Sequence, residues 1–283
     1  MFMPSAKSKS TSRKLVYPEG TWRLIVDTGP HGGAWNMAVD EAIMEAVAAG
    51  RVPPTLRFYQ WEPPCVSLGK RQPLSGIALG NCRRDGVDVV RRPTGGLAIL
   101  HTDELTYSLA TPPEDPRAAG AIMDSYRKLS QGLIFGLRRL GVHARMQPVS
   151  HGASPNSSAA CFEAPSAYEI TADTHKLMGS AQTRPYGKLL QHGSLPLSGD
   201  IGRLAEYLAF DDDSEREALA AQLRHRATTL GDILGRSVSF MEAAEALARG
   251  FSRALNLQLE SAALTAGELE VADQLAAAKA LTL

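Results

Sequence analysis

Residues 91 to 101 read Arg91-Arg92-Pro93-Thr94-Gly95-Gly96-Leu97-Ala98-Ile99-Leu100-His101, and they hold the most informative turn of the chain. Short β-rich runs at 87–92 and 98–100 flank the paired glycines. Because glycine lacks a Cβ, the backbone N–H groups here can approach a carbonyl or phosphate of a ligand. An ordinary hairpin turn explains two adjacent glycines equally well. The stretch predicts a sheet with a tight loop.

The rest of the chain continues this pattern of strands with few helices between them. Further β-rich runs lie at 22–27, 56–61, 65–68, 105–109, 168–171, 176–183 and 189–195. Apolar residues at helical spacing cover 34–49 and about 121–140, and a glycine follows each run. The expected fold class is α+β, with mixed, largely antiparallel sheets flanked by helices.

The chain changes character at Asp211, where Ala- and Leu-rich helical runs begin. Three capping-box patterns head these runs: Ser214 with Glu217, Ser239 with Glu242, and Thr265 with Glu268. We therefore expect a catalytic domain over 20–210 and a helical C-terminal extension over 211–283 packed on the same domain. Residues 1–18 contain Ser, Lys and Arg but no acid, and are expected to be a disordered leader, with a transit peptide as the alternative.

Composition excludes several classes of function. Thirty Lys and Arg balance thirty Asp and Glu, so no global charge attracts nucleic acid or an anionic membrane. No run approaches the ~18 apolar residues of a membrane span. Cys65, Cys82 and Cys161 are too few and scattered for a disulfide framework or a zinc site. We expect a cytoplasmic protein without a metal, a cofactor, or a nucleic-acid or membrane partner.

Two further residues are candidates for chemistry. Cys161 follows a small, polar segment at 150–159 and precedes Pro165, which places its thiol near a loop; most lone cysteines are nevertheless inert. Lys176 lies fifteen residues further on, after a predicted turn at 173–174 that would bring it back toward Cys161. An ammonium within about 4 to 6 Å lowers the pKa of a thiol by roughly 1 to 3 units. A solvated lysine at a strand end is the alternative.

Three motifs together resemble the biotin/lipoate protein ligase family, and within it the octanoyltransferases. They are the stretch 91–101, Ala160-Cys161-Phe162-Glu163-Ala164-Pro165-Ser166, and residues 176–184. Further matches follow in the expected order, at Ser67-Leu68-Gly69, Leu105-Thr106-Tyr107-Ser108 and Gln191-His192-Gly193-Ser194. The resemblance covers roughly residues 20–260.

The resemblance implies a tunnel for a medium acyl chain and a ping-pong reaction through an acyl-cysteine. Cys161 would be the nucleophile, and Lys176 would lower the pKa of its thiol. Octanoyl-acyl carrier protein would be the donor, and a lysine of a lipoyl domain, as in a protein like the glycine cleavage H protein, would be the acceptor. The implied substrate-binding residues are Arg92, Thr94, Gly95, Gly96, His101, Gly179, Ser180, Ala181, Gln182 and His192.

Three other activities stay open at this point. An ATP-dependent lipoate or octanoate ligase would bind an acyl-adenylate, but Leu97 departs from the triple glycine of those ligases, and the 73 residues after Phe210 hold no clear counterpart of their C-terminal domain. An amidotransferase would move octanoyl between lipoyl domains. A non-catalytic acyl-binding module would have no use for Cys161 and Lys176. We expect the protein to be a monomer.

Overall fold

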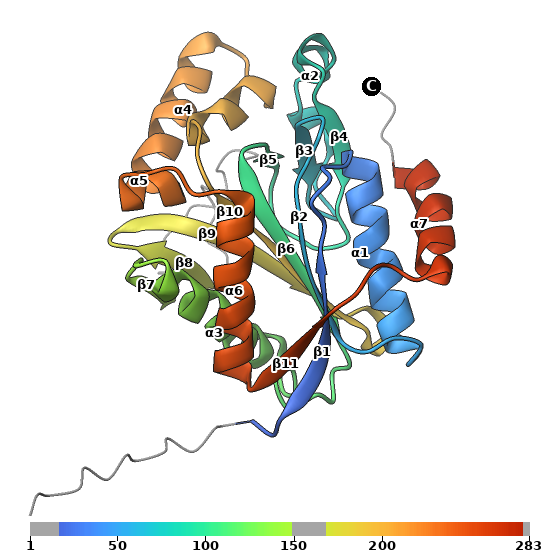
Figure 1. Ribbon diagram of the computed structural model, residues 1–283. Helices are drawn as coiled ribbons and strands as arrows, with labels where there is room; N and C mark the ends of the chain where they lie inside the picture. The colour runs from blue at the N-terminus through green and yellow to red at the C-terminus, as the bar shows by residue number, and fades with distance from the viewer. Residues whose placement is uncertain (1–16, 149–167, 280–283) are drawn as a thin grey trace, which may run out of the picture.

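A computed structural model describes residues 17–148 and 168–279. Its main sheet has eight strands in the order β11-β1-β2-β6-β10-β9-β8-β7 (Figure 1). Their bounds are β1 Gly20–Val26, β2 Thr55–Tyr59, β6 Glu104–Thr111, β7 Ala144–Pro148, β8 Tyr168–Ala172, β9 His175–Thr183, β10 Leu189–Pro196 and β11 Leu257–Ser261. A second sheet has the order β4-β3-β5, formed by β4 Asp88–Arg91, β3 Cys65–Leu68 and β5 Ile99–His101.

The predicted mixed and largely antiparallel character of the sheets is confirmed. In the main sheet β1 runs parallel to both β2 and β11, whereas the pairs from β2 to β7 are antiparallel. In the small sheet β3 runs parallel to β4 and antiparallel to β5. The turn 92–98 therefore carries the chain from one side of β3 to the other, instead of closing the simple hairpin that was the alternative.

Helices cover both faces of the main sheet (Figure 1). Their bounds are α1 Gly33–Ala48, α2 Leu79–Asp85, α3 Ile122–Arg139, α4 Asp213–Arg226, α5 Leu230–Leu234, α6 Phe240–Leu255 and α7 Ala266–Lys279. Short 3₁₀ segments are η1 Leu74–Gly76, η2 Pro185–Gly187 and η3 Ile201–Tyr207. Alternate residues of each strand point to opposite faces, so Tyr107 joins the core under α3 and α6 while Ala110 joins the core under α1 and α7.

The region after Asp211 is helical except for one strand that the sequence did not reveal, because β11 pairs in parallel with β1 at the edge of the main sheet. The domain division at Asp211 stays a prediction. The expected leader lies almost wholly outside the described residues. Elements α2 and β7 were also not predicted. Across the described residues, no helix is both long and apolar enough to cross a bilayer.

Two of the three predicted helix starts are confirmed. Ser239 accepts a hydrogen bond from the N–H of Glu242, and Thr265 and Glu268 cap each other reciprocally. The pattern at Ser214 was wrong, because Asp212 is the cap of α4 and accepts from the N–H of Glu215. Aspartate caps a helix as well as serine does, and it comes first along the chain.

Helix α7 is fastened to the domain by buried charge. Glu268 forms an ion pair with Arg23 of β1, and both side chains are almost completely buried. At the other end of α7, Lys279 pairs with Glu41 of α1 at 2.5 Å. Removing one partner of a buried ion pair leaves an unpaired charge away from water. Helix α7 therefore backs α1, which carries residues of the functional site.

Helices α3 and α6 pack so closely that their backbones touch. A Cβ on Gly250 of α6 would lie 2.3 Å from the carbonyl oxygen of Gly132 and 2.3 Å from the nitrogen of Gly136, both in α3. No side chain fits into that space. The contact matters to the site because α3 carries Met123 and Tyr126 into the cavity described below.

We expect Gly250→Ala to reduce the free energy of unfolding by about 1 to 3 kcal/mol, since the new methyl group must push α3 and α6 apart. Urea unfolding followed by circular dichroism measures the change. The matched control is Gly267→Ala in α7, where an added Cβ meets nothing within 4 Å. If Gly250→Ala proves as stable as Gly267→Ala, the tight helix contact is not a constraint on the fold.

Candidate active site

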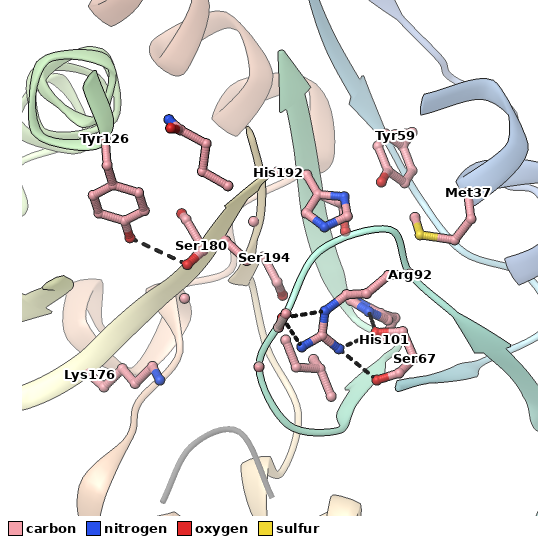
Figure 2. Close-up of a pocket in the computed structure, with 18 of the residues that line it drawn as sticks. Met37, Tyr59, Ser67, Arg92, His101, Tyr126, Lys176, Ser180, His192 and Ser194 are labelled. Atoms are coloured by element: carbon pink, nitrogen blue, oxygen red, sulfur yellow. Dashed lines mark hydrogen bonds between the residues drawn. The ribbon is translucent and has the colours of Figure 1, made fainter. Parts of the chain in front are cut away.

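One cavity of about 310 Å³ brings most of the predicted site residues together. It lies between the turn 92–98, strands β9 and β10, and the first turns of α3 (Figure 2). A volume at the lower end of the usual ~300 to 1,000 Å³ suits a small or slender ligand. The lining residues are Met37, Tyr59, Trp61, Ser67, Arg92, Gly95, Gly96, Ile99, His101, Thr106, Ile122, Met123, Tyr126, Lys176, Gly179, Ser180, Ala181, Gln182, His192, Gly193 and Ser194.

The glycine-containing turn is held by a backbone contact with the end of β3. A Cβ on Gly69 would lie 1.8 Å from the carbonyl oxygen of Gly96, so only glycine can occupy position 69 in this arrangement. Gly96 itself has φ +99°, a conformation that side chains rarely adopt. The N–H of Lys70 donates to the carbonyl of Thr94 at 2.8 Å. The Ser67-Leu68-Gly69 motif and the turn thus form one unit.

Two arginines, Arg91 at the end of β4 and Arg92 at the start of the turn, form hydrogen bonds that hold this region. Arg92 is 4% exposed and donates hydrogen bonds to the carbonyls of Ser67, Gly95 and Leu97. Arg91 donates to the carbonyls of Gly69 at 2.8 Å and Gln72 at 2.6 Å. Figure 2 shows the guanidinium of Arg92 inside the ring of the turn. Much of its donor capacity is committed to these carbonyls, although it still lines the cavity.

A buried glutamate orients His101 beneath the turn. Glu104 accepts from Nδ1 of His101 at 2.7 Å and from the hydroxyl groups of Thr106 and Ser194. Nε2 of His101 lies 2.8 Å from the hydroxyl of Ser67, and the imidazole stacks on Trp61 with 4.0 Å between ring centroids. These contacts fix the ring plane, so one edge of His101 forms a rigid part of the wall.

A second buried acid meets His192. Asp40 of α1 accepts from Nδ1 of His192 at 3.2 Å, and Nε2 of His192 lies 2.7 Å from the hydroxyl of Thr94. Burial by itself would raise the pKa of Asp40, but hydrogen bonds from His192 and Ser108 and the charge of Arg57 hold it below its usual value. The site therefore contains an ionised carboxylate that water cannot reach.

Lys176 extends into the cavity from the start of β9. Its Nζ lies 2.6 Å from the carboxylate of Glu169 on β8, and its side chain is 5% exposed. The Lys176 side chain passes beside Gly179, where an added Cβ would lie 3.5 Å from Cε and 3.8 Å from Nζ of Lys176. The predicted hairpin turn is confirmed, with Asp173 at φ 52°. The alternative of a solvated strand-end lysine is wrong.

From Gly179 onward, β9 is paired on one side only in the described residues. Residues 179–183 pair with β10, whereas the pairing of β8 with β9 ends at Ile170 and Met178. Gly193 of β10 cannot carry a side chain, because a Cβ would lie 2.4 Å from the carbonyl oxygen of Gly179. Alternate backbone N–H groups of this strand segment thus face away from β10.

Polar side chains on this part of β9 bind to the protein itself. Gln182 accepts from the hydroxyl of Ser125 at 2.9 Å and donates to Gln191 at 2.9 Å. The hydroxyl of Tyr107 donates to Ser180 at 2.8 Å, and burial raises the pKa of Tyr107 to about 12. These side chains connect β9 to α3 and β6, which leaves the backbone as the part of β9 best able to meet a ligand.

The predicted site residues fall into three groups. Arg92, Gly95, Gly96, His101, Lys176, Gly179, Ser180, Ala181, Gln182 and His192 all line the cavity. Thr94 is completely buried behind it and contacts His192. Cys161 lies outside the described residues. The roles of all of these residues stay predictions.

The sequence analysis missed the apolar wall of the cavity. Met37 and Tyr59 lie on the side away from Lys176 (Figure 2), with Trp61 packed in the same cluster. Met37 was visible only as one apolar position of a helix. Cys65 and Cys82 are buried, and burial raises the pKa of both thiols, so neither is suited to act as a nucleophile.

The protonation of His192 should make stability depend on pH. Burial lowers its pKa below 6.5 and Arg92 and His101 act in the same direction, while Asp40 opposes the shift. A histidine with a lowered folded pKa binds its proton better when unfolded, so its stabilising contribution is complete above 6.5 and is lost as the pH falls through the folded pKa.

Between about pH 7 and about pH 5, we expect the free energy of unfolding to fall more steeply for the wild type than for His192→Gln. The difference should be at most ~1.4 kcal/mol for each pH unit that separates the unfolded and the folded pKa of His192. Urea unfolding across this range measures the slopes. His225→Gln on the exposed face of α4 is the control and should follow the wild type. Identical slopes for all three proteins would contradict a buried neutral His192.

Comparison with known proteins places this cavity in a family. The model of the lipoyl protein ligase A/B catalytic domain matches residues 33–252. The chain is 46% identical to the octanoyltransferase LipM of Kyrpidia tusciae over 91% of this chain and 95% of that protein. It is 44% identical to the LipM of Symbiobacterium thermophilum over 92% and 96% of the two chains.

Solved structures agree with the sequence comparison. The bipartite lipoate protein ligase of Thermoplasma acidophilum, determined with its E2 lipoyl domain, is similar with a TM-score of 0.75, 25% identity and 92% coverage of both chains. Lipoate-protein ligase A bound with ATP gives a TM-score of 0.72 at 25% identity, covering 92% of this chain and 95% of that one. The expected family is confirmed: the chain belongs to the lipoyl protein ligase A/B catalytic domain family.

Proposed function

We propose that the chain is an octanoyltransferase of protein lipoylation. The observation that carries the proposal is the cavity, in which the glycine turn, a buried Lys176 and an apolar wall surround one space of about 310 Å³. The likeness to LipM proteins over nine-tenths of the chain supports octanoyl as the acyl group. An apolar wall holds an acyl chain by burying it, at ~0.8 kcal/mol for each CH₂ group.

The reaction proceeds in two acyl transfers with Cys161 as the nucleophile. Its thiolate attacks the carbonyl carbon of the octanoyl thioester on an acyl carrier protein, and the bond to the carrier sulfur breaks. The carrier leaves as a thiol after taking up a proton. The neutral ε-amine of the acceptor lysine then attacks the octanoyl-cysteine, an amide forms with loss of a proton, and the Cys161 thiolate is restored. Each step exchanges one acyl bond for another, so no ATP is consumed.

Lys176 acts as the positive charge of the site. Its ammonium lowers the pKa of the Cys161 thiol and stabilises the negative oxygen that develops on the attacked carbonyl. The ion pair with Glu169 at 2.6 Å supports this role, because it keeps the long lysine side chain in one position. The backbone edge of β9 after Gly179, which has no strand partner among residues 17–148 and 168–279, supplies N–H donors for the same oxygen.

The acceptor is the lysine of a lipoyl domain, and the donor is octanoyl-acyl carrier protein. The similarity to a lipoate protein ligase determined with its E2 lipoyl domain supports the acceptor. The donor rests on the likeness to octanoyltransferases alone. An ATP-dependent lipoate or octanoate ligase is the second candidate, favoured by the similarity to an ATP-bound lipoate-protein ligase A.

We expect incubation with octanoyl-acyl carrier protein to add one octanoyl group to the protein, seen as a mass adduct that hydroxylamine removes. Cys161→Ser and Cys161→Ala should form no such thioester, whereas the control Cys82→Ser should behave as the wild type, because Cys82 is buried. Free octanoate with ATP, offered in a parallel reaction, should not support modification of a lipoyl domain. Modification in that reaction, with no adduct in the first, would identify the ligase instead.

Replacement of Lys176 should slow formation of the adduct. We expect Lys176→Ala to reduce the rate at saturating donor by about 10² to 10³, the usual effect of removing one donor from a developing oxyanion. Glu169→Gln keeps the lysine but loses the carboxylate that holds it, so a smaller loss should follow. The control is Lys188→Ala, whose ammonium pairs with Glu45 outside the cavity. Single-turnover mass spectrometry measures all rates, and a Lys176→Ala protein as fast as Lys188→Ala would refute the assignment.

A further inference from the structure

Asp40 is a buried acid that no motif of the sequence singled out. Its side chain is inaccessible to solvent and accepts four hydrogen bonds, from three strands. Oδ1 accepts from Arg57 of β2 at 3.0 Å and from Ser108 of β6 at 2.7 Å. Oδ2 accepts from Tyr59 of β2 at 2.9 Å and from His192 of β10 at 3.2 Å. Asp40 does not line the cavity, but Tyr59 and His192 do.

The carboxylate determines which nitrogen of His192 carries the proton. An ionised carboxylate can only accept, so Nδ1 of His192 must donate to it. In the neutral ring Nε2 then has a lone pair and must accept. Its partner is the hydroxyl of Thr94 at 2.7 Å, which therefore donates. The direction of both hydrogen bonds follows from the charge on Asp40.

Thr94 transmits this orientation to the glycine turn. It is completely buried, and its carbonyl accepts from Lys70 at 2.8 Å. Gly95 and Gly96 follow directly and line the cavity. On its other side the turn is held by Arg92, which binds the carbonyls of Gly95 and Leu97. The Thr94 hydroxyl thus connects the glycine turn, through His192 of β10, to Asp40 of α1.

We propose that Asp40 is a positioning residue of acyl transfer, which fixes His192 as the Nδ1–H tautomer and, through the Thr94 hydroxyl, holds Gly95 and Gly96 against the cavity. The effect on rate rests on the proposed function. The tautomer and its dependence on Asp40 do not, so the two parts of the proposal can fail separately.

The substitution Asp40→Asn makes a specific prediction about the tautomer. Four donors converge on position 40, but an asparagine side chain has one acceptor oxygen and one donor nitrogen. Arg57 cannot accept a hydrogen bond, so the asparagine oxygen must face Arg57 and its NH₂ group must turn toward Tyr59 and His192. His192 can then accept only at Nδ1, which moves its proton to Nε2.

Long-range ¹H–¹⁵N NMR of histidine-labelled protein at neutral pH reads the tautomer directly, and the spectrum of His192→Gln assigns the signal. We expect a neutral Nδ1–H ring in the wild type and an Nε2–H ring in Asp40→Asn. Glu45→Gln, on the same helix, is the control and should leave the His192 signal unchanged. An Nε2–H or doubly protonated ring in the wild type, or an unaltered tautomer in Asp40→Asn, would overturn the proposal.

Kinetic measurements test the second part of the proposal, the positioning of Gly95 and Gly96 through Thr94. The Thr94 variants allow this test even if Asp40→Asn does not fold. We expect Thr94→Val, which lacks the hydroxyl, to lower kcat for octanoyl transfer about tenfold with little change in KM, while Thr94→Ser restores most of it. In Thr94→Val the His192 ring should stay Nδ1–H, because Asp40 is intact. If the double variant Asp40→Asn/Thr94→Val folds, it should be no slower than the slower of the two single variants. Both substitutions interrupt the same connection from Asp40 through His192 to Thr94, so their effects should not add.

The kinetic results also separate the two proposals. A Thr94→Val protein as active as wild type, or rates that multiply in the double variant, would show that Asp40 serves the fold alone and would overturn the positioning role. If the wild type forms no octanoyl adduct at all, the proposed function fails, and the tautomer measurements still decide whether Asp40 controls His192.

Discussion

An ionised carboxylate that is buried away from water needs hydrogen-bond donors around it. At Asp40 this requirement determines how the central strands and α1 meet. The four donors that meet it come from β2, β6 and β10, and α1 supplies the acid itself. Burying such a charge is unfavourable unless nearly every lone pair is used. The register of the three central strands against α1 is therefore constrained at one point. Helix α7, held to β1 by the ion pair of Arg23 and Glu268, keeps α1 in place from outside.

The same physical device occurs a second time, with Glu104 in place of Asp40. Glu104 orients His101 beneath one side of the glycine turn, and Asp40 orients His192 beneath the other. Each histidine then meets a hydroxyl group, Ser67 in one case and Thr94 in the other. The turn is thereby held in shape without direct contact between either acid and the cavity. A preorganised wall of this kind lowers the reorganisation that a transferring acyl group would otherwise require.

The cavity offers both charged and apolar surface, since Lys176 and Arg92 line it together with Met37, Tyr59 and Trp61. Lys176 and its partner Glu169 lie at one side, while Met37, Tyr59 and Trp61 form a wall on the other. A reacting carbonyl needs the first environment and an alkyl chain needs the second. The arrangement matches a substrate with a polar reactive end and an apolar tail, which is the chemistry of a medium-chain acyl thioester.

The sequence by itself determined the elements whose signals are local. Alternating apolar residues revealed most strands, helical spacing revealed α1 and α3, and the glycines at 95 and 96 marked the turn. The turn signal at Asp173 correctly predicted that the strand containing Lys176 pairs back along β8. The family also followed from ordered motifs. Local rules failed where two signals competed, as at Asp212, which caps α4 in place of Ser214.

Tertiary structure alone decided which polar residues are buried and what they touch. Asp40 lies in the largely buried helix α1 and is indistinguishable in sequence from its half-buried neighbour Glu41, because its own burial depends on strands at positions 57, 108 and 192. The sequence predicts that Arg92 binds substrate, which stays a prediction, but only the structure shows that its guanidinium also donates to the carbonyls of Gly95 and Leu97 in its own turn. Strand β11 gave no clear signal because it is short and exposed, and its pairing with β1 joins residues more than two hundred positions apart. Spacing along the chain encodes local geometry, whereas the solvation of a charge depends on every segment that packs around it.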